Sequence, residues 1–274
     1  MKKEVLVIGD LILDKYISGN CTRISPEAPI QIVHKQNEKF IIGGAGNVAM
    51  NLSNIGLNCK LFSLVGKDSS CEKIKEIISS NDNLEFIPFE SDRLTTQKTR
   101  IVVNGQQLLR LDEEETHDIS EKEVLIIIKK LDDLLITNNF QLVILSDYRK
   151  GFLTKSLFQN IIKLCKKHKI ETFLDPKSKN FNIYNGVSLI KPNEKEAIES
   201  CSFELKEISI NDDNLLIKVA LDIKKSTNAR FVLLTLSSQG SALIDTKSLK
   251  IFKARSTKVD VFDVTGAGDT FLSV

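Results

Sequence analysis

The chain has 274 residues, with 38 Lys and Arg against 36 Asp and Glu, so its formal net charge is +2. Because the two signs are balanced and interspersed, no polybasic face is expected, which excludes nucleic acid and charged membrane surfaces as principal partners. Hydrophobic residues make up 42% of the chain, enough for a large core, and the length fits one α/β domain with an insertion. The composition therefore favours a protein that binds a small molecule.

The cysteines and the amino-terminal segment bear on location. Five cysteines are widely spaced without a CxxC pair, which predicts small core residues in a reducing compartment, the cytoplasm. Met1-Lys2-Lys3 before an apolar run superficially resembles a signal peptide, but Asp10 and Asp14 interrupt the run and no cleavage site follows. No apolar stretch reaches the roughly 18 residues of a membrane span, so we expect no membrane association.

Short, nearly continuous apolar runs predict buried strands. The first run is Glu4–Ile8, which ends at Gly9-Asp10 and is expected to form the first strand. The same signature recurs at residues 60–65, 141–145, 171–174, 187–190 and 231–236.

Helical patterns lie between many of these runs. Apolar residues follow the 3.6-residue period over residues 45–55. Capping-box pairs at Ser69/Glu72 and Ser120/Glu123 open two further helices. Strands that alternate with helices imply βαβ units, so we expect an α/β fold with a mostly parallel sheet and helices on both faces.

Two stretches break this alternation. Ile30–His34 and Lys98–Asp112 look like strands without crossover helices, and the second folds back near Asn104-Gly105. They predict a small β-sheet that stands off the main domain, formed by segments near 15–35 and 95–112. An insertion near the carboxyl ends of the strands is placed to act as a lid over the ligand crevice.

The most specific segment is the octet Asp263–Thr270, a glycine-rich turn that leads into an apolar helical pattern. Two glycines let the backbone turn tightly, and the N–H groups of Gly266, Ala267 and Gly268 can then bind a phosphate oxygen. Asp269 is placed to accept a proton from an attacking hydroxyl. The alternative interpretation is a capped glycine turn with an acidic residue in the first helical turn.

This octet resembles the signature of the ribokinase-like (PfkB) carbohydrate kinases, and two further motifs appear in the family's order. Gly43–Ala49 (GGAGNVA) is similar to the diglycine motif, where the backbone approaches the sugar, and Asn193–Glu196 (NEKE) to the Asn-x-x-Glu motif. The resemblance implies a ribokinase-like fold and a phosphotransferase that uses ATP and Mg²⁺, with Glu196 organising the hydrated metal ion. Without the resemblance, Asn193 would only cap a helix with a solvated, charged first turn.

Further segments narrow the resemblance to the D-glycero-β-D-manno-heptose 7-phosphate kinases of lipopolysaccharide core biosynthesis. They span essentially the whole chain, at residues 23–29 (RISPEAP), 98–100 (KTR), 106–112 (QQLLRLD), 145–151 (LSDYRKG) and 175–177 (DPK). The reaction implied is ATP-dependent phosphorylation of the anomeric hydroxyl O1, which gives the 1,7-bisphosphate on the route to ADP-heptose.

The resemblance also divides the expected site between nucleotide and sugar. The nucleotide side comprises Lys177, Asn193, Glu194, Lys195, Glu196, Thr235, Ser237 and Gly240. The sugar side comprises Asp10, Asp14, Arg23, Gly43, Gly44, Asn47, Lys98, Arg100, Arg110 and Asp147. Carboxylates after the first strand can accept hydrogen bonds from sugar hydroxyls, and lid cations suit a phosphorylated sugar. Alternatively, Lys98, Arg100 and Arg110 are solvated charges on an exposed β-face.

Family members commonly pair through their lids, so the resemblance implies a homodimer. Some heptose kinases also carry a nucleotidyltransferase region after the kinase domain, which makes a fused or separate nucleotidyltransferase an expected partner. We expect residues 1–274 to form one kinase domain that is truncated at its carboxyl end, because Gly266–Val274 contains barely the first turns of a helix.

Other function classes fit less well. Gly44–Ala49 matches the dinucleotide fingerprint GxGxxA of NAD-dependent oxidoreductases, but those glycines follow the first strand, whereas here the first strand runs into Gly9-Asp10. Walker and protein-kinase signatures are absent from the sequence. Two alternatives stay open: another PfkB-type sugar or nucleoside kinase, and a non-catalytic sugar- or nucleotide-binding module.

Overall fold

The structure is a computed structural model that describes residues 4–256 and 266–273. The strands are β1 (Glu4–Gly9), β2 (Leu11–Ile24), β3 (Gln31–Gly44), β4 (Asn58–Gly66), β5 (Leu84–Ser91), β6 (Gln97–Val103), β7 (Gln106–Glu113), β8 (Phe140–Ser146), β9 (Glu171–Asp175), β10 (Leu189–Ile190), β11 (Phe231–Thr235), β12 (Ser241–Asp245) and β13 (Ile251–Ala254). The helices are α1 (Ala45–Asn54), α2 (Ser69–Ile78), α3 (Glu121–Thr137), α4 (Lys155–His168), α5 (Glu194–Ser200), α6 (Asp213–Thr227) and α7 (Ala267–Ser273), with short 3₁₀ turns η1 (Phe181–Tyr184) and η2 (Ser237–Gln239). Within these residues no helix is both long and apolar enough to cross a membrane.

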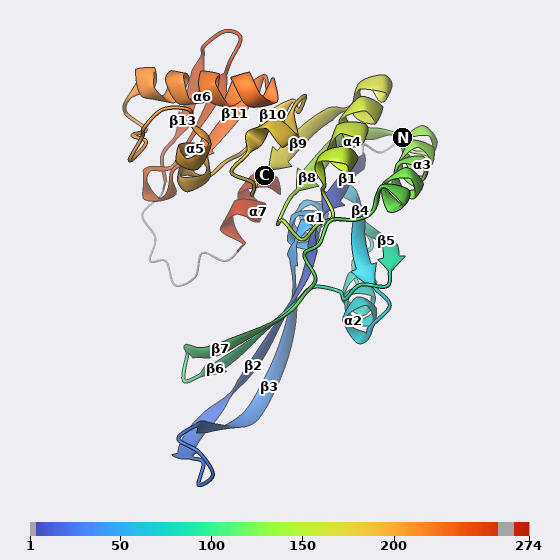
Figure 1. The fold of residues 1–274 in the computed structure, drawn as a ribbon, viewed down its shortest axis with the longest axis vertical. Coiled ribbons are helices and arrows are strands. Elements are labelled where there is room, and N and C mark those ends of the chain that lie inside the picture. The colour runs from blue at the N-terminus through green and yellow to red at the C-terminus, as the bar shows by residue number, and fades with distance from the viewer. Residues whose placement is uncertain (1–3, 257–265, 274) are drawn as a thin grey trace.

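The main sheet has nine strands in the order β13-β12-β11-β10-β9-β8-β1-β4-β5 (Figure 1). All neighbouring pairs from β5 to β11 are parallel, and the two pairs at one edge, β11–β12 and β12–β13, are antiparallel. This confirms the predicted mostly parallel sheet. Strand β1 lies between β4 and β8, so the strand order reverses beside it, and ligands of such sheets bind beyond the carboxyl ends of the strands at that point.

Helices cover both faces of the sheet because the apolar strands point side chains to both faces. Leu6 and Ile8 of β1 join a core that contains apolar residues of α3, α4 and α6. Val5 and Val7 join a second core with residues of α1, α2 and α7. The two cores hold β1 in place from both sides, which fixes where its carboxyl end lies.

The register of the parallel strands brings their carboxyl ends together. Gly9 of β1 is level with Ser146 of β8, and Ser146 is level with Asp175 of β9. The polar residues at or just after the ends of these strands and of β10 therefore share one edge of the sheet. They are Asp10, Asp147, Asp175 and Lys191.

The second sheet has four strands in the order β3-β2-β6-β7 and extends away from the main body (Figure 1). The predicted turn between β6 and β7 is present, with Asn104 at φ 49° and Gly105 at φ 79°, the left-handed pair typical of a tight hairpin. The strands are longer than the sequence suggested, since β3 continues through to Gly44 rather than ending at His34. Their middle portions are solvated on much of both faces, so no apolar pattern marks them.

Of the two predicted capping boxes, one is confirmed and one is wrong. The capping box at Ser120 and Glu123 opens α3 as predicted. The predicted capping box at Ser69 and Glu72 is wrong, because the N-cap of α2 is Asp68, one residue earlier. The Asp68 carboxylate accepts a hydrogen bond from Cys71 N at 2.9 Å. Aspartate caps a helix as well as serine does, and here it displaces Ser69 into the first turn.

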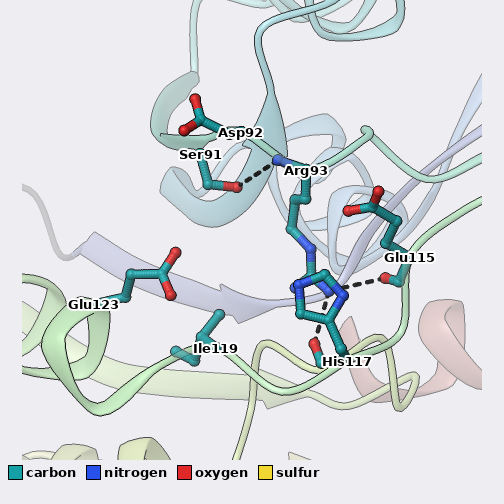
Figure 2. Close-up of a pocket in the computed structure, with 7 residues that line it drawn as sticks. All are labelled: Ser91, Asp92, Arg93, Glu115, His117, Ile119 and Glu123. Atoms are coloured by element: carbon teal, nitrogen blue, oxygen red, sulfur yellow. Dashed lines mark hydrogen bonds between the residues drawn. The ribbon is translucent and has the colours of Figure 1, made fainter.

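Arg93 fixes the segment that leads from β7 to α3 (Figure 2). Its side chain is buried, and Nη2 donates to the carbonyl oxygens of Glu115 at 3.0 Å and His117 at 2.7 Å. A cavity of about 290 Å³ adjoins this contact. None of the residues that line it belongs to the expected kinase site, which lies at the strand ends instead.

Candidate active site

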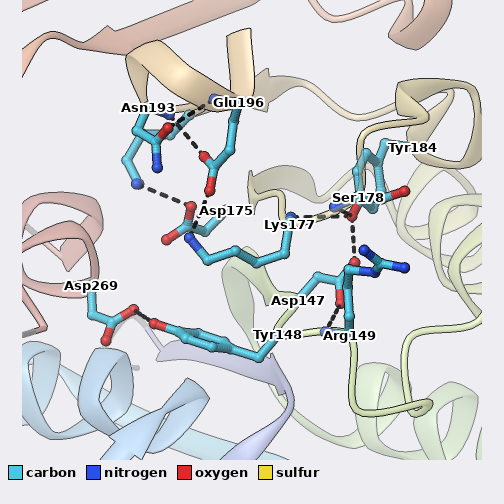
Figure 3. A network of polar contacts seen from close by, with 11 residues as sticks. Asp147, Tyr148, Arg149, Asp175, Lys177, Ser178, Tyr184, Asn193, Glu196 and Asp269 are labelled. Atoms are coloured by element: carbon cyan, nitrogen blue, oxygen red, sulfur yellow. Dashed lines mark hydrogen bonds and ion pairs between the residues drawn. The ribbon is translucent and has the colours of Figure 1, made fainter. Parts of the chain in front are cut away.

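Asp269, the expected base, lies in the first turn of α7 with only 2% of its surface exposed. Asn47 Nδ2 of α1 donates to its Oδ2 at 3.0 Å. The Tyr148 hydroxyl, just after β8, donates to its Oδ1 at 2.7 Å (Figure 3). Two neutral donors offset the cost of burying the carboxylate. Each oxygen still has a lone pair to accept from another hydroxyl.

The glycines of the turn before Asp269 sit against other residues of the site. Gly266 has φ 77°, and a Cβ there would lie 2.7 Å from Asn47 Nδ2. A Cβ on Gly268 would lie 3.5 Å from Lys191 Nζ and 3.8 Å from Asp175 Oδ2. The turn therefore approaches a buried ammonium group as well as presenting backbone N–H groups. The first residues of the octet, 263–265, lie outside the described residues.

Lys191 and Asp175 form a buried ion pair at the ends of β10 and β9. Lys191 Nζ lies 3.1 Å from Asp175 Oδ1, although that oxygen has no well-aligned hydrogen bond. Burial raises the pKa of Asp175 to about 6, against the opposing effect of Lys191 and Lys177. Sequence reasoning did not assign a role to Lys191 or Asp175. For Lys191 the available signal was a charged residue directly after the buried pair Leu189–Ile190, and for Asp175 it was the DPK segment that follows the predicted strand at 171–174.

Asn193 and Glu196 form a capping box at the start of α5. Asn193 Oδ1 accepts from Glu196 N at 2.9 Å, and Glu196 Oε2 accepts from Asn193 N at 2.9 Å. Asn193 therefore caps the helix, as the alternative interpretation predicted. The second oxygen of Glu196, Oε1, lies 2.7 Å from Lys177 Nζ (Figure 3). Burial lowers the pKa of Lys177, but its hydrogen bond to Glu196 and the charge of Asp175 outweigh that and hold it above the ordinary value.

The other residues expected on the nucleotide side separate into two groups. Thr235 pairs with Asn193 in a parallel bridge, and Ser237 and Gly240 follow it in the connection to β12. Glu194 instead accepts a hydrogen bond from Ile208 N at 2.9 Å, and Lys195 is exposed. The structure therefore brings Thr235 next to the Asn-x-x-Glu motif and directs Glu194 away from it.

Two buried aspartates hold the loop after β8. Asp10 Oδ2 accepts from Tyr148 N at 2.6 Å and from Lys150 N at 3.2 Å. Asp147 accepts from Arg149 N at 2.7 Å with one oxygen and from the Tyr184 hydroxyl with the other. Burial, and next the charge of Asp147, raise the pKa of Asp10 to about 7, and burial also raises that of Asp147. These two carboxylates are largely occupied within the protein.

Asp14 lies where the second sheet joins the body. Its carboxylate forms an ion pair with Arg100 of β6. A Cβ on Gly43 would lie 2.5 Å from Asp14 Oδ2, so the approach of this carboxylate to the β3 backbone requires glycine there. Gly44, at φ 61°, then starts α1 and carries the chain towards Asn47. The diglycine motif thus accommodates the Asp14 carboxylate and also forms the start of α1.

The lid cations share one face of the second sheet with the exception of Arg23. Lys98 is level with Asp112 and Arg100 with Arg110, so these four side chains are neighbours. Arg110 Nε lies 2.8 Å from Asp112, and Lys98 Nζ lies 4.0 Å from it. Arg23 follows Asp14 by nine residues along β2, a separation of about 30 Å for extended chain. The structure does not bring Arg23 to the other lid cations within one copy of the chain.

The carboxylates near the turn fit a hydrated Mg²⁺ ion. Across residues 4–256 and 266–273 no cluster of three or more His, Cys, Asp or Glu side chains forms a closed metal cage. Mg²⁺ does not need one, because it keeps several waters and takes only one or two carboxylates beside the substrate phosphates. Asp175 Oδ1, which lacks a well-aligned hydrogen bond, and Glu196 offer that donor set.

Sequence comparisons place the chain among carbohydrate kinases. The profile of the family described as "pfkB family carbohydrate kinase" matches residues 2–274. "Bifunctional protein HldE" of Sulfurimonas denitrificans is 38% identical over 271 residues, which cover 98% of this chain and 55% of that protein. The protein of the same name from Campylobacter concisus is 41% identical over 271 residues, with the same coverage. The chain spans about half the length of the curated relatives it matches.

Solved structures confirm the ribokinase-like α/β fold. Phosphofructokinase-2 from Escherichia coli in complex with fructose-6-phosphate superimposes with a TM-score of 0.75 at 20% identity, over 100% of this chain and 85% of that one. The ribokinase of Arabidopsis thaliana complexed with ribose and ATP gives a TM-score of 0.69 at 18% identity, over 100% and 84%. At these identities the likeness concerns the fold.

Proposed function

This chain belongs to the pfkB family of carbohydrate kinases and is therefore a phosphotransferase that acts on a hydroxyl group of a sugar, and we propose that this sugar is D-glycero-β-D-manno-heptose 7-phosphate, phosphorylated at O1. The product is the 1,7-bisphosphate, an intermediate for ADP-heptose and the lipopolysaccharide core. The similarity to the bifunctional HldE proteins over nearly the whole chain supports this substrate. The observation that carries the catalytic part is the buried Asp269, oriented by Asn47 and Tyr148 beside the glycine turn.

In the proposed reaction Asp269 accepts the proton of the sugar O1 hydroxyl. The O1 electron pair forms a bond to the γ-phosphorus of ATP, and the bond from that phosphorus to the β,γ-bridging oxygen breaks, so that ADP leaves with the electron pair. A positioned general base of this kind contributes roughly 10²- to 10⁴-fold to the rate. The remaining catalysis comes from placing and neutralising the phosphoryl group.

The transferring phosphoryl group would lie against the glycine turn. The N–H groups of Gly266, Ala267 and Gly268 donate to its oxygens, and the Lys191 ammonium behind Gly268 adds a positive charge. Lys177 contacts the phosphates from the other side. Asp175 and Glu196 would hold the water shell of Mg²⁺, and the bound ion would neutralise phosphate charge.

The nucleotide would extend from the Asn-x-x-Glu motif along β11. Asn193, Thr235, Ser237 and Gly240 line this path in our proposal, because the bridge between Asn193 and Thr235 sets the two segments side by side. Glu194 and Lys195 are left out, since one holds Ile208 and the other is exposed.

The sugar would bind between the strand ends and the second sheet, which acts as the lid. Asp14 accepts hydrogen bonds from sugar hydroxyls, beside the backbone of Gly43 and Gly44. Asp10 and Asp147 support this side by holding the loop after β8. Lys98, Arg100 and Arg110 recognise the 7-phosphate through charge-assisted hydrogen bonds. Domain and lid form one kinase unit over residues 1–274 in this proposal.

We also propose that two copies pair through the lid. Its strands and connecting loop expose apolar side chains that a monomer would leave in water. Leu109 and Leu111 of β7 are each 56% exposed, and Ile24 is 66% exposed. The paired variant Leu109→Glu/Leu111→Glu should sediment as a monomer, whereas wild type sediments as a dimer.

The cellular setting follows from the same assignments. All five cysteines are free, which supports a reducing cytoplasm. The product needs a nucleotidyltransferase to reach ADP-heptose, either fused to this domain or separate, and the relatives that match are named bifunctional and are nearly twice as long.

A coupled ADP-release assay tests the function. We expect turnover with heptose 7-phosphate to exceed that with fructose 6-phosphate, ribose and adenosine. MgATP should raise the melting temperature and NAD should not, because only a ligand of the native state stabilises it. Preference for another sugar would leave the kinase activity standing and change the substrate assignment. Reduction of NAD with any sugar would refute the kinase assignment.

A further inference from the structure

The Tyr148 hydroxyl donates a hydrogen bond to Asp269 Oδ1 at 2.7 Å. We propose that Tyr148 is a positioning residue, which holds the carboxylate of the base in the plane that presents a lone pair to the acceptor hydroxyl. This inference rests on the proposed role of Asp269 as the base. It adds a residue from the loop after β8 to the catalytic arrangement.

The two donors on Asp269 approach opposite oxygens, so together they prevent the carboxylate from rotating. Asn47 is itself held, since Asn51 Nδ2 lies 3.4 Å from Asn47 Oδ1 and 3.2 Å from Thr270 Oγ1. At the other oxygen, Tyr148 is the one side-chain donor among residues 4–256 and 266–273. Removing its hydroxyl would leave Oδ1 free to turn away from the productive orientation.

The backbone of Tyr148 is fixed by the buried carboxylates on either side of the loop. Asp10 accepts from the N–H groups of Tyr148 and Lys150. Arg149 adopts φ 56°, a conformation that non-glycine residues hold only when their surroundings enforce it, and its N–H is bound by Asp147. The loop is therefore built to hold the Tyr148 ring in one place.

The Tyr148 ring is also held by a cation on its face. Lys177 Nζ lies 5.6 Å from the centre of the ring, within the range of a cation–π contact, while the hydroxyl points to Asp269 (Figure 3). Burial and next the charge of Asp269 raise the pKa of Tyr148 far above its usual value, so the phenol stays a neutral donor.

Tyr148→Phe isolates this role, because it keeps the ring beside Lys177 and removes only the hydroxyl. We expect kcat to fall about 10- to 100-fold, the scale of a misplaced catalytic group. KM for sugar and for MgATP should stay within about threefold, since a loss confined to kcat marks an interaction made in the transition state.

Ser202→Ala is the matched control. Ser202 also donates its hydroxyl to a buried aspartate, Asp222 Oδ1 at 2.8 Å, but neither residue belongs to the expected site. This variant should lower the melting temperature and leave kcat within about threefold of wild type. If both variants lower kcat equally, Tyr148 has no special relation to the base and the proposal is wrong.

A double-mutant cycle with Asp269→Asn gives the decisive readout. If Tyr148 acts through the base, Tyr148→Phe should change kcat less than about twofold once Asp269 is already Asn. An equal factor in both backgrounds would overturn the proposal. If wild type prefers another sugar of the panel, only the substrate assignment fails and the cycle is run with that sugar. Absence of turnover with every sugar would overturn both proposals.

Discussion

Lys191 Nζ lies 3.1 Å from Asp175 Oδ1, and both side chains are almost inaccessible to solvent. The partners come from the ends of neighbouring parallel strands, so the pair joins β9 to β10 at the edge where the site lies. Gly268 approaches the same ammonium group from α7. One buried ion pair therefore connects the stability of the sheet edge with the charge beside the proposed phosphoryl site.

Lys191→Met should expose this connection, because it leaves the Asp175 carboxylate buried without a partner. We expect the free energy of unfolding to fall by about 3–5 kcal/mol. The double variant Lys191→Met/Asp175→Asn should recover most of that loss, and both proteins should lose kinase turnover. Urea unfolding followed by circular dichroism measures the difference, and equal instability of the two variants would contradict the explanation.

Asp269→Asn preserves the shape of the base and removes its basicity. We expect kcat to fall by roughly 10² to 10⁴, while the melting temperature and the stabilisation by MgATP stay close to wild type. Steady-state ADP release and a thermal shift titration give the two quantities. A kcat within threefold of wild type would reject Asp269 as the base.

The buried Asp10 should make stability depend on pH. Its pKa is about 7 in the folded protein, so the folded state holds this proton more tightly than the unfolded state does. The free energy of unfolding should therefore fall as the pH rises from about 4, near the unfolded value, and level off above pH 7. Asp10→Asn should reduce the slope, although Asp147 and Asp175 contribute in the same direction.

Asp245→Asn is the control for this pH series. Asp245 is on the surface, and backbone hydrogen bonding from Lys247 lowers its pKa, so it stays ionised above pH 5. Its substitution should leave the slope between pH 5 and 7 unchanged. Urea midpoints at three pH values suffice, and an unchanged slope in Asp10→Asn would show that Asp10 does not hold the proton.

Arg110 tests recognition of the distal phosphate. Its guanidinium is about half exposed and pairs with Asp112, so Arg110→Gln removes a charge without burying one. We expect KM for heptose 7-phosphate to rise about tenfold or more, from the loss of a charge-assisted bond worth about 1.5–3 kcal/mol. Unphosphorylated heptose should be a much poorer substrate, and its KM should be the same for Arg110→Gln as for wild type. Lys35→Gln, a lid lysine paired with Glu38, should leave both values unchanged.

Much of the fold could be predicted from sequence, because buried parallel strands leave continuous apolar runs. Glu4–Ile8 and 141–145 are examples, and each is followed by polar residues at the functional edge. The lid strands were predicted in part. Asn104-Gly105 marked one hairpin, but β2 and β3 alternate polar and apolar residues irregularly because most of their length is solvated, so their extent carried no pattern.

The candidate site could be predicted from sequence where its residues belong to a recognisable motif. It could not be predicted where residues meet only after the chain has folded. Asp269 is recognisable from its glycine turn. Lys191 follows a strand of only two residues, and Tyr148 lies in a loop without periodicity, so neither stands out until β8, β10 and α7 are brought together. Arg23 shows the converse: its sequence context suggests the site, while the length of β2 separates it from the other lid cations.

The attachment of the lid has a mechanical consequence. A single residue, Asp10, separates β1 from β2, and the Ala45 N–H, directly after β3, donates to Asp10 O at 2.9 Å, so the second sheet is attached to the body at the end of β1. Leu11–Asp14 are buried in the body, and the ten residues of β2 that follow them extend about 33 Å, so a rotation of about 10° at their base would displace the tip by roughly 6 Å. If the sheet acts as the proposed lid, a small adjustment around a bound sugar would become a larger movement at the far end, where the proposed second copy would bind.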